Sequence, residues 1–173
     1  MGNANVTITD GSSVHGNSAG INGGGLSVTG KSTVTITGGS SVHENSAAKD
    51  GGGMSVMCNA SAALTGGSSV HTNTAAGDGG GMHISSNVRL LLTGGSTVRG
   101  NSADQNGGGI FVYYFSSVAL TGGSSVQGNT AGQSGGGLML SYEGNLIVSS
   151  GSSVDSNSAG VLGGGWLLWI SAM

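Results

Sequence analysis

The chain has 173 residues, which suits one domain or one solenoid, and its composition excludes several classes of protein. Only 6% of the residues are charged and the net charge is −3, so we expect no nucleic-acid partner, which would need clustered Lys and Arg. No stretch reaches the ~18 apolar residues of a membrane span. The one cysteine, Cys58, excludes an intrachain disulfide.

One motif recurs six times with a period of 28 residues and no insertion or deletion. Each copy contains an Asn that is followed by Ser or Thr and then by Ala, at Asn17, Asn45, Asn73, Asn101, Asn129 and Asn157. Six residues after each Asn a run of three glycines begins, at positions 23, 51, 79, 107, 135 and 163. A fixed long period means that each copy is one structural unit packed against the next copies.

In chain order, the pattern predicts a lead-in at 1–5 and a single domain of six coils at 6–33, 34–61, 62–89, 90–117, 118–145 and 146–173. In the first coil, apolar residues stand at Val6 and Ile8, at Val14, and at Leu26 and Val28. Apolar pairs spaced by two predict half-buried strands. We therefore expect an all-β fold, a right-handed parallel β-helix with three short strands per coil.

The invariant columns of the repeat have physical explanations. The Asn column lies where the chain turns between sheets, and stacked amides can hydrogen-bond along the axis to satisfy backbone groups of the turn. The three glycines supply positive φ and close approach between coils. Asp50 and Asp78 precede glycines, where Asp is typical of turns.

The paired motifs resemble those of a known family. Val14-His15-Gly16-Asn17 and Gly23-Gly24-Gly25-Leu26 resemble the Phe-x-x-Asn and Gly-Gly-Ala-(Ile/Leu/Val) repeats of polymorphic outer membrane proteins, with Val in the Phe slot and Gly in the Ala slot. The resemblance covers all six repeats. It implies a β-helical passenger of an autotransporter-like surface adhesin, in the broad pectin-lyase-like class.

No pattern of chemically active residues predicts catalysis or a cofactor. The seven acids scatter over different columns, whereas polysaccharide-active enzymes cluster their carboxylates. His15, His43 and His71 share an outward column, but no Cys or carboxylate completes a metal coordination set. We therefore expect no enzyme activity, no cofactor and no metal site.

Two groups of large apolar residues are predicted to be exposed. In the fourth coil they are Phe111, Tyr113, Tyr114 and Phe115, with Phe111 in an outward column; in the sixth they are Leu162, Leu167, Trp169 and Ile170. Exposed apolar patches usually mark contact surfaces, although the sixth-coil residues equally suit a cap over the open end. Two sequons, at Asn5 and Asn59, are candidate glycosylation sites.

These features predict a non-catalytic extracellular or cell-surface structural module, a filament subunit or an adhesin stalk. Its open ends would stack head to tail or continue into further coils of a longer chain, and its candidate ligand is a glycan or a host-surface molecule. The alternative is an ice-binding solenoid, against which the Thr-x-Thr pair (Thr7/Thr9 and Thr35/Thr37) persists only through two coils. A polysaccharide-active enzyme is the third hypothesis.

Overall fold

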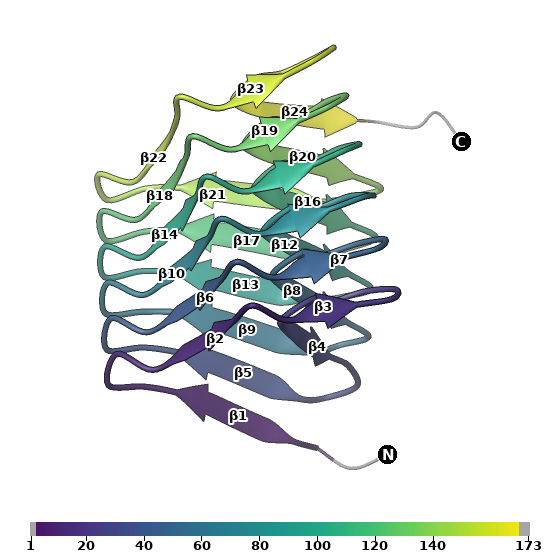
Figure 1. The fold of residues 1–173 in the computed structure, drawn as a ribbon. Helices are drawn as coiled ribbons and strands as arrows, with labels where there is room; N and C mark the ends of the chain where they lie inside the picture. The colour runs from purple at the N-terminus through teal and green to yellow at the C-terminus, as the bar shows by residue number, and fades with distance from the viewer. Residues whose placement is uncertain (1–2, 170–173) are drawn as a thin grey trace.

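The computed structural model describes residues 3–169, which form an all-β parallel solenoid of six coils without a helix. Figure 1 shows the coils stacked along one axis and winding right-handed, with the N-terminus at the bottom and the C-terminus at the top. Neighbouring strands align residues that are 28 positions apart in all four sheets. The predicted fold class and repeat are confirmed.

Each coil contributes one strand to each of four parallel sheets. The first sheet, sheet A, contains β1 (Asn5–Ile8), β5 (Thr33–Ile36), β9 (Ser61–Leu64), β13 (Arg89–Leu92), β17 (Ser117–Leu120) and β21 (Asn145–Val148). Sheet B contains β2 (Ser13–His15), β6 (Ser41–His43), β10 (Ser69–His71), β14 (Thr97–Arg99), β18 (Ser125–Gln127) and β22 (Ser153–Asp155).

Sheet C is built from strands of two residues: β3 (Ser18–Ala19), β7 (Ser46–Ala47), β11 (Thr74–Ala75), β15 (Ser102–Ala103), β19 (Thr130–Ala131) and β23 (Ser158–Ala159). Sheet D contains β4 (Leu26–Val28), β8 (Met54–Met57), β12 (Met82–Ser85), β16 (Ile110–Tyr113), β20 (Leu138–Ser141) and β24 (Trp166–Trp169). The expectation of three strands per coil is therefore wrong. The segment after each Asn is too short to show alternation, yet it pairs with its copies in the adjacent coils.

The apolar columns line a continuous core between the sheets. In the middle coils, side chains such as Leu64, Val70 and Met82 are fully buried. Alternation places the residues between them outside, as the burial of Arg89–Leu92 shows, with residues 90 and 92 buried and 89 and 91 exposed. Burying each large aliphatic side chain contributes about 1.5–3 kcal/mol, which drives the coils together.

A ladder of buried Asn side chains runs along the solenoid axis at the corner between sheets B and C. Asn101 is typical. Its Oδ1 accepts hydrogen bonds from the backbone N and the Nδ2 of Asn73, each at 3.0 Å. Its Nδ2 donates to the Val70 carbonyl at 3.1 Å and to the Asn129 Oδ1 at 2.9 Å. Each inner Asn thus joins its own coil to both neighbours.

The glycine run lies against this ladder and leaves no room for side chains. A Cβ on Gly81 would lie 2.9 Å from the Nδ2 of Asn101, and one on Gly108 would collide with the carbonyls of Thr130 and Gly136. The first glycine of the run, Gly107, adopts a φ of 62°, which an L side chain rarely tolerates. Glycine is therefore required here by packing as well as by conformation.

We predict that Asn101→Ala strongly destabilises the fold. The change leaves the Asn73 backbone N–H buried without a partner, at about 1–3 kcal/mol, and removes the hydrogen bonds that the Asn101 Nδ2 donates to Val70 and Asn129. Urea denaturation should show a loss of roughly 3 kcal/mol or more. The matched control is Asn17→Ala, because Asn17 is exposed at the end of the same ladder. Equal losses in the two variants would contradict the role given to the buried ladder.

Candidate functional site

An exposed cluster of aromatic rings stands at the corner between sheets D and A. Tyr114 and Phe115 form the turn from β16 to β17, and Tyr142 occupies the equivalent turn one coil later. Their exposed fractions are 47%, 49% and 46%. Ring centroids lie 4.9 Å apart for Tyr114 and Phe115, and 5.0 Å apart for Tyr113 and Tyr142. Tyr113, which was expected to be exposed, is half-buried at the end of β16. We call Tyr113, Tyr114, Phe115 and Tyr142 the aromatic corner.

The backbone of this turn is left-handed, which is energetically unfavourable for aromatic residues. Tyr114 and Phe115 have φ of 51° and 55°, both in the left-handed region. The preceding coil adopts the same turn with Ser86 and Asn87 at 66° and 63°. A left-handed conformation costs most residues about 1–2 kcal/mol, while Asn tolerates it. The turn keeps this conformation in four consecutive coils, whichever residues occupy it.

Phe111 does not join the exposed cluster, although it was expected to. It is only 7% exposed, and its ring lies 5.5 Å from that of His83 and 6.1 Å from that of Tyr113. The reason is that the glycine run lies against the outer side of sheet D. A Cβ on Gly107 would lie 2.9 Å from the Phe111 Cα. Strand alternation correctly turns Phe111 away from the core, but a second layer of backbone covers it.

A polar groove of about 310 Å³ adjoins the aromatic corner. Three of its lining residues, Asn87, Phe115 and Glu143, occupy the same position in consecutive coils, and Arg89 and Asn145 stand two residues further on. Val88, Ser116 and Ser117 complete the lining. Sequence reasoning missed this groove. Aligning the polar residues of the turn column by the 28-residue period would have brought them together.

The two charged side chains of the groove carry opposite signs. Within residues 3–169, neither Arg89 nor Glu143 forms an ion pair. The groove thus offers an aromatic wall, amides, hydroxyls, a cationic donor and an anionic acceptor.

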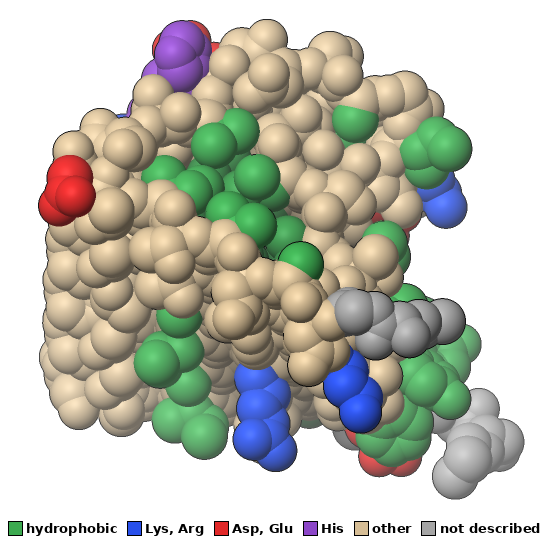
Figure 2. All heavy atoms as spheres, turned by 90° about the horizontal axis from the view of Figure 1, so that it is seen from below, with side chains coloured by type: hydrophobic (Ala, Val, Ile, Leu, Met, Phe, Trp, Pro, Cys, Tyr) green, Lys and Arg blue, Asp and Glu red, His purple; other side chains and the backbone are tan. Residues whose placement is uncertain are grey.

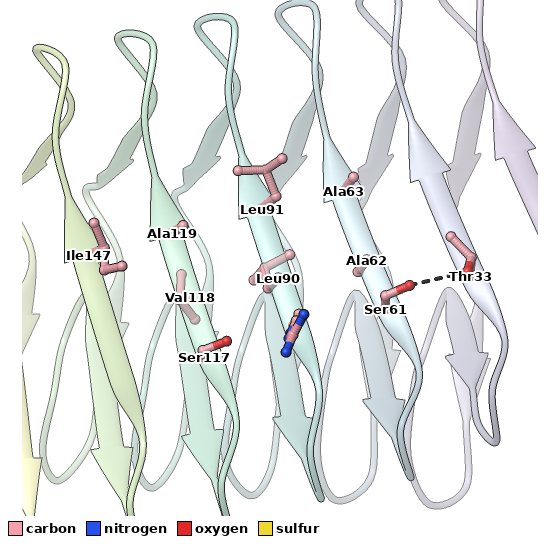
Figure 3. A pocket seen from close by; sticks show the side chains of 11 residues that line it. Thr33, Ser61, Ala62, Ala63, Leu90, Leu91, Ser117, Val118, Ala119 and Ile147 are labelled. Atoms are coloured by element: carbon pink, nitrogen blue, oxygen red, sulfur yellow. Dashed lines mark hydrogen bonds between the residues drawn. The ribbon is translucent and has the colours of Figure 1, made fainter.

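A second groove, of about 370 Å³, runs along the outer face of sheet A. Figure 3 shows Leu91 and Ile147 standing out from the strands, with the small Ala63 and Ala119 on the neighbouring strands. This is the face that the ice-binding hypothesis would use. The Thr9 column lies outside it, because Thr37 follows the end of β5 and its Oγ1 accepts a hydrogen bond from the Oγ1 of Thr65 at 2.8 Å. Within residues 3–169, the outward Thr column of sheet A ends at Thr35, and Ala63 takes the next position.

The three histidines of sheet B form a parallel stack. Ring centroids are 4.9 Å apart for His15 and His43 and 4.8 Å apart for His43 and His71, with the planes within 2°. Burial, Arg99 and His43 lower the pKa of His71, against an opposing effect of Glu44. Among residues 3–169, no group of three His, Cys, Asp or Glu side chains is placed to hold a metal ion.

The stacked carboxylates Asp50 and Asp78 belong to a second hydrogen-bonded ladder. Asp50 Oδ1 accepts from the backbone N of Asp78 at 3.0 Å, and Asp78 Oδ1 accepts from the backbone N and the Nδ2 of Asn106, each at 3.0 Å. Burial raises the pKa of Asp78, while the Asn106 hydrogen bonds oppose the shift. These acids stabilise turns, as their position before glycines indicated.

The sixth coil leaves the core open. Leu162 and Trp169 are exposed and Leu167 is half-buried, whereas the predicted residue Ile170 lies outside the described part of the chain. Trp166 and Leu168 continue core columns but are exposed, and they border a hollow of about 490 Å³. The described residues of this coil therefore do not close the end.

Both sequons stand on the surface. Asn5 begins β1 and Asn59 lies in the turn after β8, and both side chains are exposed. Glycosylation at these two positions stays a prediction.

Comparison with known proteins finds no relative for this chain. A scan against protein-family models finds no match, and searches of curated proteins and of solved structures find no similar chain. The β-solenoid architecture is therefore established by the structure, and the resemblance to polymorphic outer membrane proteins stays a hypothesis. Within residues 3–169 there is no helix with the length and hydrophobicity needed to cross a membrane.

We predict that His83 makes the stability of the fold sensitive to acid. His83 is almost fully buried, and within the described residues its Nδ1 has no hydrogen-bond partner. Burial lowers its pKa below the usual 6.5, and the opposing effects of Asp50 and Asp78 do not overcome that shift. Because the folded-state pKa is depressed, its stabilising effect is complete above pH 6.5 and is lost as the pH falls through the folded pKa.

The test is His83→Phe, which places in this column the residue that the next coil already carries. Urea denaturation midpoints at about pH 7.5 and about pH 5 should differ less in the variant than in the parent. A difference of the same size in both proteins would show that His83 is not the responsible group.

Proposed function

We propose that this chain is a non-catalytic structural module that extends by stacking one coil on the next through its open ends. The next coil belongs to a second copy, placed head to tail, or to a continuing chain. A Gly/Ser/Thr/Asn-rich solenoid with only 6% charged residues suits an extracellular or cell-surface filament or adhesin stalk. The passenger segments of autotransporter-like adhesins are the family setting that its repeat motifs resemble.

The observation that carries this proposal is the complementarity of the two ladder ends. Within residues 3–169, the Oδ1 of Asn17 accepts no hydrogen bond, whereas every later Asn of the column accepts two from the coil before it. At the other end, the Nδ2 of Asn157 donates only to the Val126 carbonyl, and its backbone N has no acceptor among the same residues. One end lacks the donors that the other end offers.

The apolar columns support the same arrangement. Figure 2 looks onto the N-terminal end and shows hydrophobic side chains gathered in the middle of that face. Val6 is exposed there, and Val14 and Leu26 are only half-buried. At the C-terminal end Val148 and Trp166 are exposed in equivalent inward positions. Uncovered core and unpaired strand edges both favour the addition of another coil.

We predict that the purified chain forms unbranched rods at micromolar concentration, with an axial repeat near the ~29 Å that six strand spacings require. The variant Val6→Lys with Leu168→Lys should remain folded but fail to assemble. Both side chains are exposed at the ends, so each lysine reaches solvent in a single copy. Stacking would bury the two charges at a cost of several kcal/mol.

The matched control carries two lysines on a lateral face, Leu91→Lys with Ile147→Lys, where stacking leaves them in solvent. Electron microscopy and sedimentation velocity should show rods for the control and for the parent chain. Monodisperse single copies of the parent at all concentrations would contradict head-to-tail stacking. Rods that persist in the Val6→Lys, Leu168→Lys variant would place the contact elsewhere.

A further inference from the structure

The aromatic corner and the polar groove form one continuous surface. Phe115 belongs to both, and Glu143 in the groove directly follows Tyr142 of the corner. Tyr114 and Tyr142 occupy the same position in adjacent coils, so their backbones are separated by one strand spacing of about 4.8 Å. The surface therefore presents neighbouring rings beside a row of hydrogen-bonding groups.

This combination matches the chemistry of a sugar ring. A pyranose has a face of C–H groups, which packs on an aromatic ring, and an edge of hydroxyl groups, which each donate and accept hydrogen bonds. The amides of Asn87 and Asn145 both donate and accept, while Arg89 donates and Glu143 accepts. One Arg and one Glu leave the groove without an excess of either charge, which suits a neutral ligand.

We propose that the aromatic corner and its groove bind a neutral oligosaccharide, with sugar rings packed on Phe115 and Tyr142 and hydroxyls bonded to Asn87, Arg89 and Glu143. Size favours this ligand over a protein partner. A groove of about 310 Å³ lies at the small end of ligand sites. Three exposed rings cover far less area than the roughly 800 Å² per partner of a standard protein interface.

Affinity electrophoresis in gels containing soluble polysaccharides tests the proposal. The probes are laminarin, hydroxyethyl cellulose, mannan, xylan and galactan, and titration calorimetry with chitin oligosaccharides completes the set. The host protein carries Val6→Lys and Leu168→Lys, so that assembly does not contribute to retardation. The binding proposal is thereby separated from the stacking proposal, and either can fail alone. We expect at least one probe to bind.

The decisive variant is Phe115→Asn, because Asn87 already occupies the equivalent left-handed position and the turn should keep its shape. Loss of one packed ring should weaken the binding about tenfold. Glu143→Gln, which removes the charge but keeps the shape, should also weaken it. The control Leu91→Asn removes an exposed apolar side chain outside the groove and should bind like the host.

Three results would overturn the proposal: no probe binds the host, Phe115→Asn binds like the host, or Leu91→Asn loses binding equally. Association of the host with itself that disappears in Phe115→Asn, without any response to sugar, would instead assign the aromatic corner to a protein contact.

Discussion

The buried Asn ladder is the interaction on which the rest of the structure depends. Each inner amide makes four hydrogen bonds, three to the coil before it and one to the coil after it. In this buried site an unpaired polar group costs about 1–3 kcal/mol. The ladder forms only if every coil returns to the same corner, displaced along the axis by one strand spacing. A period of 28 residues without insertion or deletion is the sequence counterpart of that geometric demand.

The ladder also explains where the sequence is free to vary. Inward columns, the Asn corner and the glycine run are constrained by neighbours on both sides, and they change little from coil to coil. The outward positions of sheet A and the turn after sheet D are more exposed, and there the coils differ in sequence. A fold of identical units acquires a local surface only at such positions, which is where the aromatic corner and the groove lie.

The sequence predicts the architecture well because the repeat samples each environment six times. Leu64 or Val70 alone proves little, but a whole apolar column identifies an inward position. Two features escaped this reasoning for physical reasons. A two-residue strand such as β11 has no alternation to detect, so sheet C was missed. The burial of Phe111 depends on the glycine run packing outside sheet D, which no strand pattern encodes.

The groove was missed for a different reason, since its residues come from consecutive coils and become neighbours only through stacking. Asn87, Phe115 and Glu143 are 28 residues apart in the chain and adjacent in the solenoid. They lie in the turns from sheet D to sheet A on the side of the solenoid, while Asn17 and Asn157 lie in the first and last coils, at the two ends of the ladder. The stacking and the ligand binding that we propose would therefore use separate surfaces. A stacked assembly would repeat the corner at every ~29 Å and could hold an extended polysaccharide through many weak contacts.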